Sequence, residues 1–378
     1  MSGILAKLFN ASLGHTQVLA LPQTAQVCSS AVGDVFQSAQ VCVARYNRGA
    51  DAVQRAVGHL AYGASEYTLF DLASLTKVWS TTTLLALLQQ EGQLLLDDSI
   101  QKYWPDVASR SNVEAFLQTT TIRSLLLHTS GLPPVYAFHS ESQHAKAGAN
   151  LQILAEQLLT KISDATITLN NINKTVYSDL GFLLLGAIIE KIENASLDEI
   201  FRRRICAPLG LERLQYLPVD PNIAPTEVCA WRERLLIGEV HDEMAAYTHG
   251  VAAHAGVFGN AASVLSIAEA WLQPLLLQPS ALHLRRETVE LFFAKDISGR
   301  ALGWDVPSPI GEYRSCGAHF SDQSRGHLGF TGTSLWMDPQ NGVIAVVLTN
   351  RVYPTRANTK IREFRPLVHD AIMRDCGF

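Results

Sequence analysis

The chain of 378 residues is long enough for one large domain or two moderate ones with a substantial core. Apolar residues make up 47% and charged residues 17%, a balance that is typical of enzymes and excludes an intrinsically disordered chain. The net charge of −5 comes without a basic stripe, so we expect no nucleic-acid partner.

The cysteines predict neither a metal site nor a disulfide framework. They lie far apart, with no C-x-x-C pair and no histidine at zinc-finger spacing: Cys28, Cys42, Cys206, Cys229, Cys316 and Cys376. Buried free thiols are the expectation for a chain of this length. We therefore expect no metal and no cofactor.

No stretch reaches the ~18 to 20 apolar residues that a membrane-spanning helix needs. Residues 1–26 carry one lysine and apolar residues interrupted by His, Gln and Asn, whereas a signal peptide has an unbroken apolar stretch after a charged start. We therefore expect a cytoplasmic protein without a membrane span, and a periplasmic location is the alternative.

The first elements along the chain are two strands and a helix. Residues 39–46 (AQVCVARY) and 56–62 (AVGHLAY) have the composition of β-strands, and NRGAD between them predicts a turn. The apolar helix that follows is predicted from about Ser74 to Gln90, and Gly92 ends it.

From that glycine to about residue 260 the pattern is mostly helical. Apolar residues recur at helical spacing in 151–162 (LQILAEQLLTKI) and in 180–193 (LGFLLLGAIIEKIE). Loops such as HTSGLPP, with its Gly and Pro residues, separate these helices.

The C-terminal part returns to β-structure. Residues 326–338 (GHLGFTGTSLWMD) and 342–350 (GVIAVVLTN) predict two adjacent strands joined by a DPQN turn. An amphipathic helix over about 357–374 closes the chain. Strands at both ends with helices between them predict an α/β fold of the α+β type, in which a helical region is inserted.

Several common catalytic motifs are absent from the sequence. Neither G-x-S-x-G nor G-x-x-x-x-G-K-[ST], G-x-G-x-x-G or H-E-x-x-H occurs, which excludes a nucleophile elbow and leaves nucleotide and zincin sites without support. His249 and His254 are five residues apart, whereas helical metal ligands are four apart. We predict that both histidines are structural or line the site.

An S-x-x-K motif occurs twice, and it is short enough to arise by chance. The copy at Ser99 and Lys102 follows two aspartates and precedes Trp-Pro, which predicts a short exposed helix with a polar cap. The copy at Ser74 and Lys77 begins an apolar helix and places both side chains on one face. A lysine in this apolar setting is costly without a partner or a purpose, although a capping serine beside a snorkelling lysine is the alternative.

A serine hydroxyl is a weak nucleophile that needs an adjacent base. Lysine at ~10.4 and tyrosine at ~10 both have a pKa about three units too high, so the site must supply ~4 kcal/mol. A tyrosine near Lys77 would have its phenolate stabilised by the ammonium, which predicts a further motif with a tyrosine. Tyr177, in TVYSDLGFLLLG, is the candidate.

The order of S-x-x-K, the Y-x-N-like triplet of residues 177–179 and a K-T-G-like strand resembles the serine β-lactamase and penicillin-binding protein superfamily. More narrowly, the chain is similar to its class C β-lactamase, D,D-peptidase and esterase branch. The segments that carry this likeness span about residues 66 to 360: FDLASLTK, LLLHTSGLPP, VYSDLGFLLLG, GEVHDE, HAGVFG, GHLGFTGTS and LTNRVYPTR.

The resemblance implies a β-lactamase/transpeptidase-like fold with an antiparallel sheet built from both chain ends. We therefore expect a discontinuous sheet domain, residues 1–73 and 262–378, and a mainly helical region, residues 74–261, with the active site between them.

The resemblance also implies an acyl-enzyme mechanism. Ser74 would be the nucleophile, and Tyr177 with Lys77 would move the proton from the nucleophile to the leaving group. The backbone N–H groups of Ser74 and Phe330 would form the oxyanion hole.

One departure from the family pattern lies on the K-T-G-like strand, which reads His327-Leu328-Gly329. A histidine is mostly neutral at neutral pH if its pKa is near ~6.5, so it anchors a substrate carboxylate less well than a lysine. We expect His327 and Gly329 to bind substrate, with Arg351 or Arg356 as a compensating cation; solvated loop charges are the alternative.

The other departure is Asp179, which occupies the position where β-lactamases usually carry Asn. A carboxylate cannot donate to a substrate carbonyl, and it favours the charged form of Lys77, which shifts the role of base toward Tyr177. We still expect Asp179 to lie at the substrate.

The predicted function is a serine hydrolase acting on a small amide or ester. A D-amino-acid or cell-wall-derived peptide and a carboxylic ester are the expected substrates, with a β-lactamase as one alternative. A catalytically silent binding or sensor protein is the other alternative. The expected partner is a small molecule or short peptide, and the sequence does not indicate an oligomeric state.

Overall fold

The main β-sheet is built from both ends of the chain. The computed structural model describes residues 16–48, 53–107, 111–138, 149–170 and 174–378. The sheet runs in the order β1 (Gln17–Val18), β3 (Val53–Tyr62), β2 (Ala39–Arg48), β11 (Val343–Thr349), β10 (Ser334–Asp338) and β9 (Arg325–Leu328). All neighbouring strands pair antiparallel except β1 and β3. The predicted antiparallel sheet of the α+β type is confirmed.

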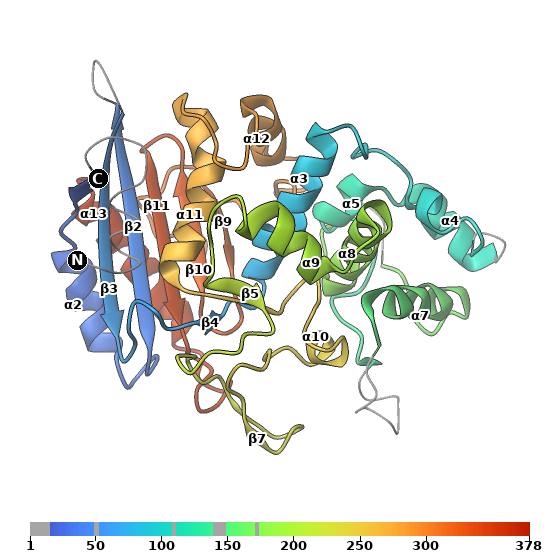
Figure 1. Cartoon of the computed structure of the whole chain (residues 1–378), viewed down its shortest axis with the longest axis horizontal. Coiled ribbons are helices and arrows are strands. Elements are labelled where there is room, and N and C mark those ends of the chain that lie inside the picture. Colours follow the sequence, from blue (N-terminus) through green and yellow to red (C-terminus); the bar gives the residue numbers. More distant parts are fainter. Residues whose placement is uncertain (1–15, 49–52, 108–110, 139–148, 171–173) are drawn as a thin grey trace.

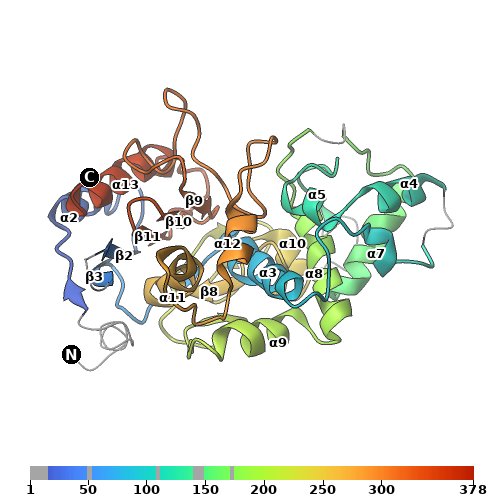
Figure 2. The same cartoon turned by 90° about the horizontal axis from the view of Figure 1, so that it is seen from above.

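Helices cover both faces of this sheet. Helices α2 (Pro22–Ala31) and α13 (Ile361–Asp375) lie on one face and α11 (Ala261–Leu272) on the other (Figures 1 and 2). Successive residues of the central strands enter different clusters: Val41 and Val43 pack with α13, whereas Cys42 packs on the α11 side. Because the side chains of a strand alternate between its two faces, β2 is apolar on both faces, and each face packs against helices.

The predicted strand over residues 326–338 is wrong in one respect. It consists of β9 and β10, separated by a turn of residues 329–333 that we call the oxyanion turn, because it contains Phe330, a predicted oxyanion donor. Gly332 has a φ of +110°, which favours glycine, and the Gly329 N–H donates to Thr333 O at 2.8 Å. The chain therefore folds back on itself at this point.

The other predicted elements of the sheet domain are confirmed with shifted ends. Strands β2 and β3 are longer than predicted by two and three residues, from 46 to 48 and from 56 back to 53. The turn predicted at NRGAD falls mostly outside the described residues. The final helix, α13, begins at Ile361 instead of residue 357.

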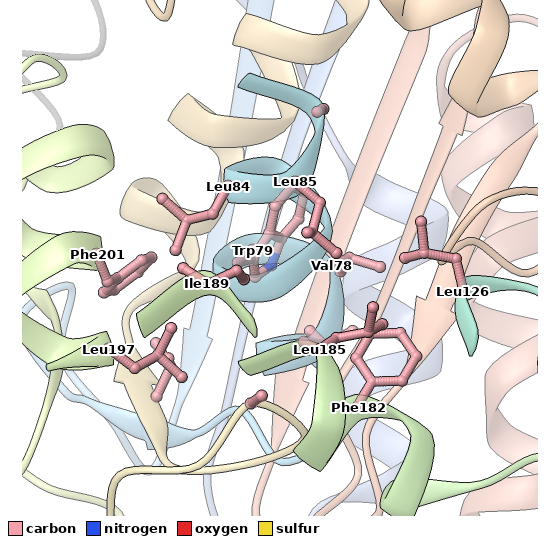
Figure 3. Packing of buried hydrophobic residues seen from close by; sticks show 14 of the residues in the cluster. Val78, Trp79, Leu84, Leu85, Leu126, Phe182, Leu185, Ile189, Leu197 and Phe201 are labelled. Atoms are coloured by element: carbon pink, nitrogen blue, oxygen red, sulfur yellow. The ribbon is translucent and has the colours of Figure 1, made fainter. Parts of the chain in front are cut away.

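A helix that is buried up to Leu88 joins the sheet to the helical part of the chain. It begins after Ser74 and consists of a π-helical segment, η1 (Lys77–Thr82), and α3 (Thr83–Gln90). It ends at Gly92, which has a φ of +73°, as predicted. Trp79 and Leu84 pack between α8 (Asp179–Glu193) and neighbouring helices (Figure 3). Such wide helical turns are frequent at functional sites.

The helical part contains the two helices predicted at 151–162 and 180–193, namely α7 (Leu151–Ser163) and α8. The remaining helices are α4 (Ser111–Thr119), α5 (Ile122–Leu126), α9 (Leu197–Phe201), α10 (Glu243–Tyr247) and α12 (Arg286–Phe293), with short turns η2 (Ile100–Tyr103), η3 (Arg202–Cys206) and η4 (Gln273–Leu276). Two small sheets complete the fold, β4 (Phe70–Asp71) with β8 (Val257–Gly259) and β5 (Leu214–Tyr216), and β6 (Val228–Cys229) with β7 (Arg234–Leu235).

The cysteines are all free and buried, which confirms the prediction of thiols in the core. None of the helices in the described ranges has the length and apolar character that crossing a bilayer requires. The first 15 residues, on which the predicted absence of a signal peptide mainly rests, lie outside the described part.

Shortening one buried side chain of α8 tests this core. We expect Leu185→Ala to lower the free energy of unfolding by about 2–5 kcal/mol, because Leu185 is fully buried and its loss leaves a cavity. Leu95→Ala is the matched control, since Leu95 is 60% exposed and should change stability by less than about 0.5 kcal/mol. Urea unfolding followed by tryptophan fluorescence measures both; equal effects of the two substitutions would contradict the packing described here.

Candidate active site

The predicted nucleophile sits on a strained turn between β4 and the buried helix. Ala73, directly before Ser74, has a φ of +47°, a conformation that costs a non-glycine residue about 1–3 kcal/mol. The buried carboxylate of Asp71 accepts from the Ala73 N–H at 2.8 Å and from the His241 N–H at 2.7 Å. Asp71 therefore holds the turn that presents Ser74.

Lys77 is fully buried, and its ammonium contacts three groups. Nζ lies 3.0 Å from Ser74 Oγ, 3.3 Å from the His254 carbonyl oxygen and 2.6 Å from Asp179 Oδ1. The contacts with Ser74 and His254 are hydrogen bonds, and the contact with Asp179 is an ion pair that balances the buried charge. The structure thus brings Ser74, Lys77 and Asp179 together from two separate helices, with His254 on a loop.

Tyr177 completes this cluster. Its ring centroid lies 4.9 Å from Lys77 Nζ and 6.0 Å from the ring of His327. The residue is 38% exposed and faces the cleft described below. Ser74, Tyr177 and Asp179 therefore all lie around the ammonium of Lys77.

The protonation state of this cluster follows from burial and charge. Burial alone would lower the pKa of Lys77, but the carboxylate of Asp179 and the phenol of Tyr177 outweigh burial and raise that pKa above its usual value. Burial raises the pKa of Tyr177, although the ammonium of Lys77 acts in the opposite direction. At neutral pH the resting site therefore holds an ammonium at Lys77 and a neutral phenol at Tyr177.

The HTSGLPP loop positions Tyr177. His128 Nδ1 accepts from the Ser178 N–H at 3.0 Å, and the His128 carbonyl oxygen accepts from the Val176 N–H at 2.9 Å. The rings of His128 and Tyr177 are tilted toward each other, with centroids 4.6 Å apart. Burial lowers the pKa of His128 well below its usual value, so this ring is a neutral support. Sequence reasoning did not assign His128 a role, although LLLHTSGLPP was among the family segments.

The oxyanion turn is tied to the nucleophile strand by two threonines. Thr331 Oγ1 donates to the Asp71 carbonyl oxygen at 2.7 Å, and Thr333 Oγ1 donates to the Leu72 carbonyl oxygen at 3.0 Å. Within the described parts of the chain, the backbone N–H groups of Ser74 and Phe330 have no acceptor. Both donors are therefore available to a ligand.

His327 is a buried neutral side chain. Its Nδ1 lies 2.9 Å from the Leu328 carbonyl oxygen, and burial lowers the pKa of His327 to about 4, although Asp305 acts against this. Nε2 has no partner among the residues that the structure describes. The strand therefore carries no fixed cation at this position, as the sequence suggested.

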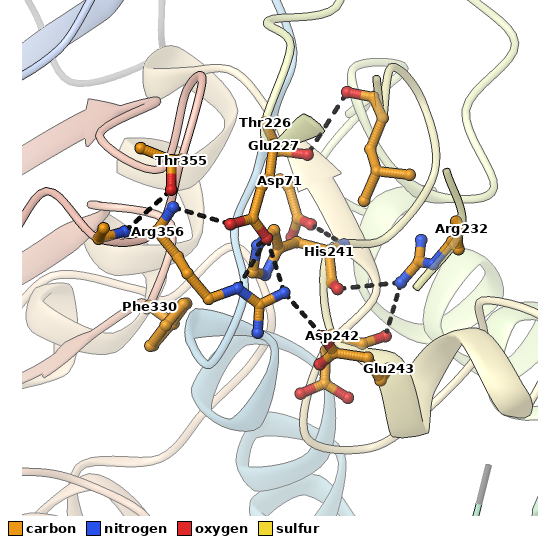
Figure 4. Close-up of polar contacts among 12 residues, drawn as sticks. Asp71, Thr226, Glu227, Arg232, His241, Asp242, Glu243, Phe330, Thr355 and Arg356 are labelled. Atoms are coloured by element: carbon orange, nitrogen blue, oxygen red, sulfur yellow. Dashed lines mark hydrogen bonds and ion pairs between the residues drawn. The ribbon is translucent and has the colours of Figure 1, made fainter. Parts of the chain in front are cut away.

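Arg351 is buried, whereas Arg356 lies on the following loop with its side chain 39% exposed. Arg351 is 6% exposed and donates to the carbonyl oxygens of Phe330, Arg356 and Asn358 at 2.8 to 3.0 Å. Arg356 pairs with Glu227 and Glu243 at 2.7 Å, beside Phe330 (Figure 4). Both guanidinium groups are thus engaged within the protein.

A cleft of about 410 Å³ brings most of the predicted site residues to one surface: Ser74, Tyr177, His327, Gly329, Phe330 and Arg351. Lys77 and Asp179 do not line it and lie beneath Ser74 and Tyr177. Sequence reasoning missed the lining residues Arg300, Asp305, Arg362 and Arg365, which come from a loop and from α13. A larger cavity of about 620 Å³ is lined by Trp231, Phe258 and His249 among others, and it contains none of the residues predicted to be catalytic or to bind substrate.

The structure also shows the roles of the second S-x-x-K motif and of His254. Ser99 caps η2 by accepting from the Gln101 N–H, and Lys102 is exposed and pairs with Asp98, so the second S-x-x-K is the capped surface turn that was predicted. His254 is buried, pairs with Asp242 at 2.9 Å and offers its carbonyl oxygen to Lys77.

Comparison with known proteins shows to which family this chain belongs. The β-lactamase family model matches residues 32–369. The chain is similar to a putative D-alanyl-D-alanine carboxypeptidase of Escherichia coli (strain K12), 32% identical over 310 residues that cover 76% of this chain and 70% of that protein. It is also similar to an N-acetylmuramyl-L-alanine amidase of Bacillus subtilis (strain 168), 30% identical over 307 residues that cover 75% and 68%.

Solved structures share the fold. EstCE1, a hydrolase with promiscuous acyltransferase activity, superposes with a TM-score of 0.67 at 20% identity, covering 93% of this chain and 97% of that one. A penicillin-binding protein homologue from Caulobacter crescentus gives a TM-score of 0.66 at 17% identity, covering 94% and 97%. The predicted serine hydrolase of the β-lactamase and penicillin-binding protein superfamily is thereby confirmed, and the chain belongs to the β-lactamase family.

Proposed function

We propose that this chain hydrolyses small amides or esters through an acyl-enzyme at Ser74. The observation that carries the proposal is the 3.0 Å contact between Lys77 Nζ and Ser74 Oγ, in a cleft where two backbone N–H groups have no acceptor within the described chain. An activated hydroxyl beside paired N–H donors is the arrangement that acyl transfer needs.

Acylation would proceed with Tyr177 as the proton acceptor. Ser74 Oγ attacks the substrate carbonyl carbon while its proton passes to the phenolate form of Tyr177, and the carbonyl oxygen becomes an oxyanion between the Ser74 and Phe330 N–H groups. Collapse of this intermediate breaks the bond to the leaving group, which takes the proton from Tyr177. Water then attacks the acyl carbon by the same route and releases the acid.

Lys77 and Asp179 would set the electrostatics of this step. The 2.6 Å ion pair keeps Lys77 charged, so the lysine acts as a fixed positive charge that stabilises the phenolate of Tyr177. Asp179, predicted to contact substrate, is proposed instead to act through Lys77, because its carboxylate is engaged there.

The substrate proposed is a D-amino-acid peptide or a small carboxylic ester. The relatives named as a D-alanyl-D-alanine carboxypeptidase and as a muramyl amidase support the peptide, and a cleft of about 410 Å³ suits a short one. A β-lactamase is less well supported, since the neutral His327 offers a weaker hold on a carboxylate than a fixed cation. Buried free cysteines support the proposed cytoplasmic location.

The proposed division of the chain also fits this cleft. Its lining draws Ser74 and Tyr177 from the proposed helical region and His327 and Phe330 from the proposed sheet domain. The proposed helical region thus supplies the nucleophile and the proposed base, and the proposed sheet domain supplies the Phe330 oxyanion donor. This distribution supports the proposed division at residues 74 and 261.

Covalent labelling tests the nucleophile. We expect a fluorophosphonate to add a single adduct to the wild type, because Ser74 is within reach of a base and of two oxyanion donors. Ser74→Ala should abolish the adduct, whereas Ser99→Ala, in the second S-x-x-K, should leave it unchanged. Intact-protein mass spectrometry measures all three proteins.

An unlabelled wild type would contradict the proposal and favour a silent binding protein. With labelling established, release of D-alanine from a D-alanyl-D-alanine peptide, cleavage of a short ester and decay of a chromogenic cephalosporin separate the three substrate classes.

The pH dependence of labelling tests the electrostatics. We expect the rate to rise between about pH 7 and pH 10, because burial raises the pKa of Tyr177, the proposed base, and its phenolate is scarce at neutral pH. The carboxylate of Asp179 also raises the pKa of Tyr177, and Asp179→Asn removes this negative charge. The rising limb should therefore move to lower pH by about 1 to 3 units.

The control is Asp98→Asn, which removes the carboxylate partner of the exposed Lys102 in the second S-x-x-K and should not move the profile. A wild-type rate that is flat above neutral pH, or a limb that moves upward in Asp179→Asn, would refute the assigned roles of these groups.

A further inference from the structure

The proposed oxyanion donor shares a peptide unit with a carbonyl group that binds an arginine. The Gly329–Phe330 peptide is trans, so its C=O and its N–H point in opposite directions. Arg365 Nη2 donates to the Gly329 carbonyl oxygen at 2.7 Å. Fixing this oxygen on the side of Arg365 fixes the Phe330 N–H on the other side, away from the arginine.

The same guanidinium nitrogen closes the other end of the oxyanion turn. Arg365 Nη2 also donates to the Thr333 carbonyl oxygen at 2.9 Å, and that oxygen accepts from the Gly329 N–H at 2.8 Å. One cation therefore binds the first and the last residue of the turn. Hydrogen bonds from a charged donor are about twice as strong as neutral ones, so this contact is well suited to hold a peptide plane.

The hydrogen bonds of the Arg365 guanidinium within the described part of the chain all go to carbonyl oxygens of the oxyanion turn. It lies on α13, is 8% exposed and pairs with no carboxylate in the described part of the chain. Its Nε has no partner there either. Burial lowers the pKa of Arg365 to about 10, which still leaves the side chain charged at neutral pH. The carbonyl oxygens of the turn are thus the acceptors for a buried positive charge.

We propose that Arg365 is a positioning residue for the oxyanion hole. It orients the Phe330 N–H into the cleft and, by drawing electron density toward the carbonyl oxygen of the same peptide, makes that N–H a stronger donor. The inference rests on the proposed function, because it requires the Phe330 N–H to meet a developing oxyanion.

Arg351 differs from Arg365 in this respect. Arg351 Nε donates to the Phe330 carbonyl oxygen at 2.8 Å, which belongs to the following peptide unit. That contact restrains the turn but does not polarise the Phe330 N–H. The effect proposed for Arg365 is therefore specific to one peptide bond.

The role proposed for Arg365 can be tested with two esters that differ only in whether the carbonyl carbon carries oxygen or sulfur. The substrate is the short ester that the wild type cleaves, compared with its thiono analogue, in which C=S replaces C=O and the sulfur accepts hydrogen bonds poorly. Removing one oxyanion donor costs about 10²–10³ in kcat, so weakening one in Arg365→Met should cost the oxo ester about 10- to 100-fold. KM should change little, and the oxo-to-thiono ratio of kcat should fall.

Two variants complete the design. Arg365→Lys keeps a cation that reaches one of the two carbonyl oxygens, and we expect it to restore part of the ratio. Arg374→Met is the matched control on the same helix, because Arg374 contacts Gln23 at the surface and should leave kcat and the ratio at wild-type values. Melting temperatures of all variants show how far each is folded at the assay temperature.

A ratio in Arg365→Met equal to that of the wild type would overturn the inference, whether or not both rates fall, since a merely structural loss slows both esters alike. If Arg365→Met does not fold, Arg365→Lys decides: an intermediate ratio supports the inference and a wild-type ratio overturns it. Failure of the proposed function is distinguishable, because the wild type itself would then neither take up the fluorophosphonate nor turn over either ester.

Discussion

The candidate active site depends on one buried ammonium. Lys77 contacts Ser74 at 3.0 Å, Asp179 at 2.6 Å and the carbonyl oxygen of His254 at 3.3 Å, so three distant segments meet at a single charge. A charge in a nonpolar interior is tolerated only when it is paired and fully hydrogen-bonded. The helix after Ser74, α8 and the loop at His254 must therefore come together as one unit, which fixes the helical side of the cleft.

A second set of polar contacts joins the edge of the sheet to the nucleophile. The threonines of the oxyanion turn donate to the carbonyl oxygens of Asp71 and Leu72, and the Asp71 side chain in turn supports the strained turn before Ser74. Because each of these acceptors is within four residues of the nucleophile, the distance between Ser74 and the oxyanion turn is set by hydrogen bonds. Arg365 extends this connection to α13.

The charges around the cleft are arranged differently from the family pattern in the sequence. The strand contributes the neutral His327, while arginines nearby donate to backbone carbonyl oxygens. Positive charge therefore acts on the backbone and on Tyr177, through Lys77, more than directly on a substrate carboxylate.

The sequence by itself determined what local geometry dictates. Ser74 and Lys77 share a face because helical residues three apart are neighbours, and the helix at 180–193 was visible as an apolar repeat. Only the tertiary structure decided the break of the strand at the oxyanion turn, the support of Ala73 by Asp71 and the bond from Arg365 to Gly329. These contacts join residues on different elements, and such pairings depend on how the elements pack, which no local periodicity records.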